Sequence, residues 1–500
     1  MAMQYTLPNF EKKQNFSDLK LSEFSHNGDC QQKERIALEN RYSEILEQTD
    51  EFNRKLVSYQ GNKGELVHKW IHYREGFSFQ LVEKLIKKFN VKPGDTLLEP
   101  FSGSATTLLA CKALEINALG IEILPICHLT WQAKSHVFEY DIEELNNILG
   151  LLEQIEPTQV SMRFPHIVIT QSAFSHKTEN DLMFYTQWIE TIKINNETKI
   201  LLRLLLSSVL EDISYTRKDG QYLRWDYRSE KIKKRNEIRV SKGKKPTKKI
   251  DKGELPTVKE ALVNAFRKII YDIEFTQRKL SPKGKQEMIK GSVLEILPTL
   301  EPNQFNGVIT SPPYCNRYDY TRTYALELAY LNIGESEIRK LRQTQLSCTV
   351  ENRSKLNDLE GYYKSINQSD RFKEISRIIL QNRVFQEINE ALKKRWDIRD
   401  INNKGVLSMV EGYFAELTFV FAEIYRTCKS GSKVAFVNDN VRYGGEIIPV
   451  DLLSTELAEN IGFVPMRVYV LPQRKGNSSQ QMGKFGRVAL RKSITVWKKP

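Results

Sequence analysis

The sequence predicts an α/β fold, because short apolar runs that fit strands alternate with longer segments that fit helices. Seven candidate strands can be counted, and a polar loop separates the last two as in a hairpin. A chain of 500 residues is long enough for more than one domain or for one domain with large insertions. We therefore expect a sheet whose strands are interrupted by inserted segments.

The first 60 residues are polar and helix-prone, and the stretch 32–56 predicts a helix. We assign 1–60 to an N-terminal helical extension. The segment 70–78 then leads into a helical pattern that ends near Phe89.

A strand, a loop of small residues, a helix and a second strand follow one another between residues 95 and 122. Such a loop lets a ligand approach the backbone at the amino end of a helix, and an acid about 20 residues further on can take ribose hydroxyls. Glu122 lies nineteen residues after Gly103. The loop has one glycine, and Ala105 stands where a second is expected. A nucleoside site and a purely structural turn both fit this pattern.

The strand pattern returns at 287–292 and again at 307–309, where it runs directly into Thr310, Ser311, Pro312, Pro313 and Tyr314. Neither proline has an N–H group, so this stretch predicts a stiff loop at the carboxyl end of a strand, where open α/β sheets bind ligands. Free carbonyls and an aromatic ring suit a planar base with an exocyclic amine. A proline-stiffened surface turn is the alternative.

The remaining predicted elements complete the sheet. They are a helix over 409–428, a strand over 433–437, a helix over 450–461 and strands over 466–471 and 493–497. Between residues 141 and 285 the alternation of strands and helices is lost, and 332–404 is charged and helical in character. Both stretches are therefore expected to be insertions.

Most of the net charge of +13 is concentrated in one segment, because 217–252 carries fifteen Lys or Arg residues against five acids. Tyrosine and tryptophan are interleaved with arginine at its start, and a lysine tract follows. Concentrated cations with stacking side chains are typical of nucleic-acid binding, although a basic tract is often a solvated loop. Together with the proline-tyrosine loop, the segment favours nucleic acid as the partner.

Other features exclude several classes. No apolar run approaches a membrane span, and the N-terminus has no apolar signal-peptide core. The six cysteines form no C-x-x-C pair and predict reduced thiols in a cytoplasmic protein. His68 and His72 have a possible metal spacing but no apparent third ligand, so we expect structural histidines and no metal.

These motifs together resemble the S-adenosylmethionine-dependent, amino-methylating DNA methyltransferases, which modify cytosine N4 or adenine N6. Residues 99–107 resemble the family's cofactor loop, with Ala105 in place of its last glycine. Glu122 resembles the acid that holds the ribose, and Ser292 stands where the family usually has an aspartate near the adenine. Residues 311–314 match the catalytic tetrapeptide in its serine variant, which occurs mostly in cytosine-N4 enzymes.

The resemblance implies a Rossmann-like sheet of seven strands, mostly parallel, and S-adenosylmethionine as the cofactor. It divides the chain into a cofactor part at 61–140, an insertion for target recognition at 141–285, a catalytic part at 286–331, a helical insertion at 332–405 and the second half of the sheet at 406–500. The cofactor-binding residues it implies are Trp70, Phe77, Ser78, Glu99, Pro100, Phe101, Gly103, Ser104, Thr106, Glu122 and Ser292. The expected DNA-binding residues are Arg217, Lys218, Arg224, Trp225, Arg228, Arg317 and Arg474.

The chemistry of the tetrapeptide fits an amine target. The lone pair of an exocyclic amine is delocalised into the ring, and hydrogen bonds to Ser311 and the Pro312 carbonyl would favour a pyramidal nitrogen. Tyr314 would stack on a base flipped out of the duplex. Methylation at carbon 5 instead uses a cysteine after a proline, and none of the six cysteines follows one.

We therefore expect a site-specific DNA methyltransferase that acts on cytosine N4 in duplex DNA and protects it from a cognate restriction endonuclease. Adenine N6 is the close alternative, and RNA or a protein glutamine is a more distant one. A DNA-binding module without activity is disfavoured by the intact cofactor loop. We expect a cytoplasmic monomer.

Overall fold

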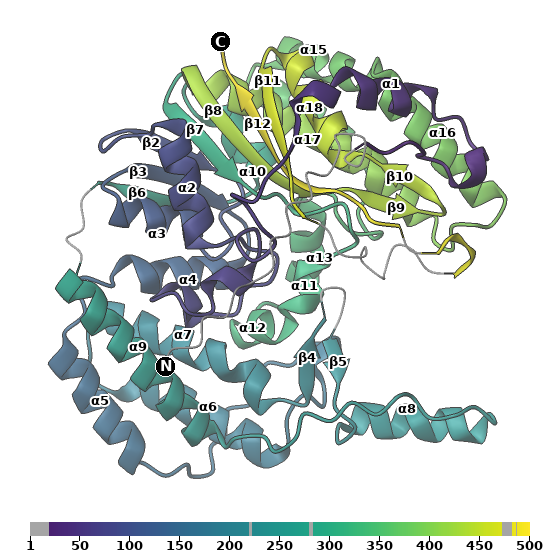
Figure 1. Ribbon diagram of the computed structural model, residues 1–500. Coiled ribbons are helices and arrows are strands. Elements are labelled where there is room, and N and C mark those ends of the chain that lie inside the picture. Colours follow the sequence, from purple (N-terminus) through teal and green to yellow (C-terminus); the bar gives the residue numbers. More distant parts are fainter. Residues whose placement is uncertain (1–19, 220–222, 280–283, 473–482, 487) are drawn as a thin grey trace, which may run out of the picture.

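The computed structural model describes residues 20–219, 223–279, 284–472, 483–486 and 488–500. Its centre is an eight-stranded sheet in the order β1-β11-β12-β8-β7-β2-β3-β6 (Figure 1). The strands are β1 Leu46–Gln48, β2 Thr96–Glu99, β3 Asn117–Glu122, β6 Gln286–Lys290, β7 Phe305–Thr310, β8 Cys428–Asp439, β11 Val464–Val470 and β12 Lys492–Lys498.

Seven of these strands are the predicted ones, and their pairing is mostly parallel. β6, β3, β2, β7 and β8 form a continuous parallel set. β12 is antiparallel to both of its neighbours, β8 and β11. The α/β fold class with a mostly parallel, Rossmann-like sheet is therefore confirmed.

Helices cover both faces of the sheet, because successive strand residues point to opposite sides. Leu97 and Ile309 pack in one core with α2 (Phe79–Phe89) and α3 (Thr106–Ala113). Their neighbours Leu98 and Val308 pack on the other side against α10, α17 and α18. The bounds of these three helices are Val293–Ile296, Gly405–Thr427 and Val450–Ile461.

By length and composition alone helix α17 could cross a membrane, although the sequence predicted no run of this kind. However, 72% of the most apolar 18-residue stretch of this helix is buried inside the protein. Its apolar character therefore fits a central core helix of the α/β unit.

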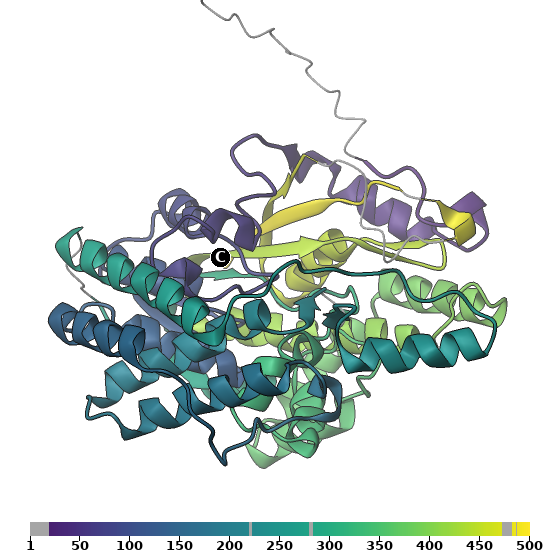
Figure 2. The same ribbon diagram turned by 90° about the horizontal axis from the view of Figure 1, so that it is seen from below.

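The stretch 141–285 forms a helical unit beside α4 (Pro125–Ser135) and continues the core of that helix. Figure 2 shows α8 with its return segment extending from this unit along the underside of the molecule, and no residue of α8 is buried. The elements are α5 Ile142–Gln154, α6 His176–Thr191, α7 Asn196–Ile213, β4 Thr216–Lys218, β5 Leu223–Trp225, α8 Glu230–Ser241 and α9 Val258–Lys279.

The loop at 311–314, called the catalytic loop here for its predicted role, leads into α11 (Tyr320–Thr323) and α12 (Ala325–Tyr330), and the stretch 332–405 then forms further helices. Ile338 lies in the core with α12, whereas the helices from residue 356 onward pack against α17 and α18 rather than standing apart. The bounds of these further helices are α13 Glu335–Thr344, α14 Leu356–Ser365, α15 Ser369–Leu380 and α16 Arg383–Asp397.

The helix predicted over 32–56 is wrong in its second half. α1 covers Lys33–Arg41, and β1 then adds an eighth strand that pairs in parallel with β11. The sequence predicted helix here because the stretch is polar, whereas hydrogen bonds to the exposed edge of β11 decide the backbone of β1.

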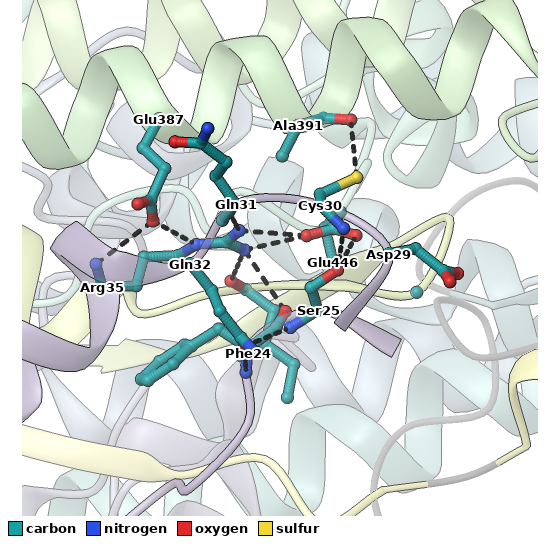
Figure 3. Close-up of polar contacts among 12 residues, drawn as sticks. Phe24, Ser25, Asp29, Cys30, Gln31, Gln32, Arg35, Glu387, Ala391 and Glu446 are labelled. Carbon is teal, nitrogen blue, oxygen red and sulfur yellow. Dashed lines mark hydrogen bonds and ion pairs between the residues drawn. The ribbon is translucent and has the colours of Figure 1, made fainter. Parts of the chain in front are cut away.

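A buried ionic network fixes this N-terminal extension to the rest of the protein (Figure 3). The guanidinium of Arg35 is fully buried and forms ion pairs with Glu387 of α16, at 2.9 Å, and with Glu446, at 3.0 Å. Glu446 belongs to β10 (Glu446–Ile448), which pairs with β9 (Val441–Tyr443). Arg395 of α16 also donates to Glu446, at 2.8 Å. Three segments far apart in the sequence thus meet at one carboxylate.

We expect Arg35→Met to lower the free energy of unfolding by about 3–5 kcal/mol, because it leaves the Glu387 carboxylate buried without its partner. Arg41 is a suitable control, since it pairs with Glu456 at 3.3 Å while half exposed. Arg41→Met should cost only about 0–1 kcal/mol. Urea unfolding followed by tryptophan fluorescence compares the two, and equal midpoints for both variants would contradict a structural role for Arg35.

Candidate active site

The carboxyl ends of β2, β3, β6 and β7 surround a pocket. Because parallel strands end at the same edge of a sheet, the loops after them meet there. The lining comes from residues 75–77, 99–104, 121–124, 291–293 and 344–346, together with Tyr73, Thr106, Ser311, Pro313 and Tyr320. The cofactor loop and the catalytic loop therefore share one cavity.

The cofactor loop is a tight turn between β2 and α3. The Ser102 hydroxyl donates to the Glu99 carbonyl at 3.0 Å, and the Ala105 N–H donates to the Ser102 carbonyl at 2.8 Å. Gly103 has φ +49°, and a Cβ there would lie 2.7 Å from the Tyr73 ring. Ala105 also has a left-handed backbone, with φ 65°. The family's last glycine is thus replaced by an alanine that keeps the glycine-type conformation.

Glu122 holds this loop against the next strand. Its carboxylate accepts the N–H of Gly103 at 2.7 Å and those of Ile123 and Leu124 at 2.8 Å. Burial raises the pKa of Glu122, although these three bonds act in the opposite direction. The acid lines the pocket as expected and also supports the backbone that a nucleoside would approach.

Two buried groups lie beneath the loop. The ammonium of Lys134 donates to the Ser104 carbonyl at 3.0 Å. Glu99 is 2% exposed, and its Oε2 has no hydrogen-bond partner within the described residues. Burial raises the pKa of Glu99 well above its usual range. A buried carboxyl oxygen without a partner, on a residue that lines a pocket, is a suitable site for a cationic or donor group of a ligand.

Stacked tyrosines join the cofactor side of the site to the catalytic side. Tyr73 stacks on Tyr324 with ring centroids 5.2 Å apart and on Tyr320 at 6.3 Å. The Arg74 N–H donates to the Tyr324 hydroxyl at 2.8 Å. The segment 73–77 is thereby held against the chain that follows the catalytic loop.

Most of the expected cofactor residues lie in the pocket lining, and two do not. Trp70 is outside the lining, and its indole N–H donates to Asp272 of α9 at 3.1 Å. Ser78 is also outside, and its hydroxyl caps α2 by accepting the Leu81 N–H at 3.2 Å. The lining residues among the prediction are Phe77, Glu99, Pro100, Phe101, Gly103, Ser104, Thr106, Glu122 and Ser292.

The sequence reasoning missed the contribution of the helical insertion. Residues 344–346 line the pocket, and the Ser292 hydroxyl donates to the Thr344 carbonyl at 3.1 Å. Nothing in the local sequence near Thr344 signals this role, because only the packing of α13 brings its carboxyl end to the site. Glu75 and Gly76 were also missed, although both lie inside the segment 70–78 that leads into the first helix of the α/β unit.

The catalytic loop directly follows β7, as predicted. Ser311 and Pro313 line the pocket, whereas Pro312 and Tyr314 are buried and are not in its lining. The Ser311 hydroxyl donates to the Tyr314 hydroxyl at 3.1 Å. On one side the Tyr314 ring faces the ammonium of Lys492, 4.9 Å from its centroid, and Lys492 pairs with Asp439 at 3.2 Å.

The loop is also supported from the β9–β10 hairpin. The hydroxyl of Tyr443 donates to the carbonyl of Cys315 at 2.7 Å, and both residues are buried. Tyr443 is the partner of Glu446 in the hairpin register. The ionic network at Arg35 is therefore connected through two short strands to the residue after Tyr314.

S-adenosylmethionine can be accommodated by these residues. The pocket combines a glycine-containing turn at a helix start with acids at the ends of β2 and β3. Glu99 has a buried oxygen that no described residue satisfies and that suits an ammonium group. Among the described residues, no group of three or more His, Cys, Asp or Glu side chains could hold a metal ion.

The expected DNA-binding residues lie in different environments. Arg217 and Arg224 are exposed on β4 and β5, and Arg224 pairs with Asp219. Trp225 packs beneath the ammonium of Lys231, 4.4 Å from its ring. Arg228 is part-exposed and pairs with Asp226 at 2.7 Å.

Two other expected contacts lie near the catalytic loop or outside the described chain. Arg317 follows that loop with φ 68°, and its Nε has no hydrogen-bond partner within the described residues. Arg474 lies outside the described residues.

Lys218 differs from the other expected DNA contacts because it is buried. It forms an ion pair with Glu327 of α12, and its ammonium lies 5.0 Å from the centre of the Tyr324 ring. This environment gives Lys218 a structural role, and we do not assign it to a DNA-binding surface. Sequence alone did not distinguish it from exposed Arg217, its neighbour on β4.

Comparison with known proteins agrees with this geometry. A family model described as "DNA methylase", for N6 and N4 methyltransferases, matches residues 5–130. The chain is 58% identical over 485 residues to "Type II methyltransferase M.BsoBI" of Geobacillus stearothermophilus, which covers 97% of this chain and 95% of the relative. It is 39% identical over 472 residues to "Type II methyltransferase M.AvaI" of Nostoc sp., with 93% of each chain covered. The protein therefore belongs to the amino-methylating N4 and N6 DNA methyltransferases, a family that uses S-adenosylmethionine.

Proposed function

We propose that the protein transfers a methyl group from S-adenosylmethionine to the exocyclic N4 of cytosine in duplex DNA. The observation that supports the target is Ser311, which heads the serine variant of the tetrapeptide and lines the same pocket as the cofactor loop. Adenine N6 remains the alternative, because either base presents a planar amine to the same loop.

Bound S-adenosylmethionine supplies an electrophilic methyl group on sulfur. The chain's own residues orient the amine. Since the Ser311 hydroxyl donates to Tyr314, its oxygen lone pairs stay available to accept an amine N–H. The Pro312 carbonyl is the second proposed acceptor. Two such bonds aim the nitrogen lone pair at the methyl, and this positioning supplies much of the rate.

We propose that the projecting arm formed by α8 and the return segment 242–252 binds the DNA backbone. The return segment lies along α8, since Arg239 donates to the Lys245 carbonyl at 2.9 Å and Asn236 accepts from Thr247 at 3.0 Å. Lys244, Lys245 and Lys248 are exposed on it. Arg217, Arg224, Trp225, Arg228, Arg317 and Arg474 are the further proposed contacts.

We propose that this methylation protects the DNA from a cognate restriction endonuclease and that the enzyme acts as a cytoplasmic monomer without a metal. The names of the relatives, both "Type II methyltransferase", support the protective role. The six cysteines are free and buried, which supports a reducing compartment.

The target is tested by incubating the protein with methyl-labelled S-adenosylmethionine and plasmid DNA. We expect label in the DNA, and mass spectrometry of the digested nucleosides should identify N4-methylcytosine. Finding N6-methyladenine would replace the proposed base with the alternative. Label in RNA or protein but none in DNA would overturn the proposal.

Tyr314→Ala should lower kcat/KM for DNA by about 5- to 150-fold, because stacking on a base contributes about 1–3 kcal/mol. S-adenosylmethionine affinity should stay near wild type, since Tyr314 is not in the cofactor lining. Tyr314→Phe keeps the ring and is the matched control, with a smaller loss expected. Turnover by the alanine variant at the wild-type rate would contradict the stacking role.

Replacing Lys244, Lys245 and Lys248 with Gln should weaken DNA binding and flatten its dependence on salt. The slope of log K against log salt should fall by about 0.9 for each phosphate that the variant no longer neutralises. The control replaces three exposed lysines of the helical insertion at 332–405, namely Lys364, Lys393 and Lys404. An arm variant with the same salt slope as this control would exclude the arm from the DNA surface.

A further inference from the structure

Glu75 is a strained residue at the junction between the cofactor pocket and the catalytic loop. It lines the pocket beside Gly76 and Phe77, and Ser311 lines the same cavity. Its backbone has φ 63°, in the left-handed region that costs a non-glycine residue about 1–2 kcal/mol. Such strain persists only where the surroundings impose it, and it is concentrated at functional sites.

The groups that face Glu75 belong mostly to the catalytic side of the site. The charges of Lys492 on β12, Asp439 on β8 and Arg74 in its own segment all affect the pKa of Glu75. The charge of Glu75 in turn raises the pKa of three tyrosine hydroxyls in the catalytic loop and at the start of α11. These belong to Tyr314, Tyr318 and Tyr320. Glu75 is therefore electrostatically coupled to the tetrapeptide and the residues after it, and it shares the pocket with Ser311.

The carboxylate of Glu75 has no partner of its own among the described residues. Lys492, the sheet cation that lowers the pKa of Glu75, pairs with Asp439 at 3.2 Å. Neither a hydrogen bond nor an ion pair engages the Glu75 side chain within the described chain, and the side chain is only partly buried. By contrast, Glu122 is occupied by three backbone N–H groups. Glu75 is thus the pocket carboxylate that remains available on the catalytic side.

We propose that Glu75 is a catalytic residue that accepts the proton released by the target amine. This inference rests on the proposed function, because it takes an exocyclic amine as the methyl acceptor. It does not depend on whether that amine belongs to cytosine or adenine.

The reaction requires such an acceptor. The amine nitrogen forms a bond to the methyl carbon while the bond from carbon to sulfur breaks, and the electron pair of that bond stays on sulfur. The sulfonium charge is thereby neutralised, and the nitrogen gains a positive charge that it loses with one proton. The tetrapeptide Ser311 to Tyr314 contains no carboxylate to take this proton. Glu75 takes it and returns it to solvent when the product leaves.

The surroundings of Glu75 tune it for this task. Burial raises its pKa above the usual range, Lys492 and Arg74 oppose this shift, and Asp439 adds to it. A base whose pKa lies nearer to neutrality is a more effective proton acceptor. Since the ionised form is required, the rate of methyl transfer should fall as the pH drops through the pKa of Glu75.

Single-turnover methyl transfer to plasmid DNA, measured across pH, tests the role. Glu75→Gln should lower the rate by about 10²- to 10⁴-fold, as expected for loss of a general base, and should remove the acid limb of the pH profile. Affinities for S-adenosylmethionine and DNA should stay within about twofold of wild type. An unchanged rate, a persisting acid limb, or a loss confined to cofactor affinity would overturn the proposal.

Two further variants keep this test independent of folding. Glycine adopts the left-handed backbone readily, so the Glu75→Gly variant should fold and bind cofactor. Its rate of methyl transfer should be low, and added formate should partly restore that rate. Absence of rescue in a cofactor-binding protein would count against proton transfer. Glu115→Gln is the matched control, since Glu115 is also a glutamate with a left-handed φ of 60° but lies in the turn between α3 and β3. It should keep the wild-type rate and pH profile.

The same experiment separates the two proposals. The nucleoside methylated by the wild-type protein reports on the proposed function. The ratio of variant to wild-type rate on that nucleoside reports on Glu75. N6-methyladenine with a slow Glu75→Gln would change the base and retain the proton acceptor.

Discussion

The site depends on the parallel pairing of β2 with β3 on one side and with β7 on the other. Parallel strands end at a common edge, so the loops that follow them are brought together however far apart they lie in the sequence. Gly103 and Ser311 line one cavity for this reason. Reversal of any of these strands would carry its loop to the opposite edge of the sheet.

Residues outside the cofactor loop and the catalytic tetrapeptide support the loops at this edge. Tyr73 stacks between the cofactor side and α11, and it explains why Gly103 has no room for a side chain. Tyr443 holds the carbonyl of Cys315, the residue after Tyr314. Through β9 and β10 that contact reaches Glu446, where Arg35 and Arg395 converge. The N-terminal extension is therefore part of the support of the catalytic loop.

Two departures from the family's usual motifs have physical explanations. Ala105 adopts the left-handed backbone that the glycine would supply, and its methyl group is fully buried. Ser292 uses its hydroxyl to bond the Thr344 carbonyl, so a contact with the helical insertion replaces the carboxylate at this position. The pocket keeps its shape in both cases, because backbone geometry defines it more than these side chains do.

The sequence by itself determined the fold class, the seven predicted strands and the positions of both loops. Those features are local, because a short apolar run, a small-residue turn or a pair of prolines restricts the backbone wherever it occurs. The eighth strand β1 was not predictable, since only the free edge of β11 selects it. Tertiary packing decided that Lys218 is buried, that Trp70 is not in the pocket lining and that Glu75 is. A side chain's burial and partners depend on which distant segments surround it, and neighbouring residues in the sequence do not encode that.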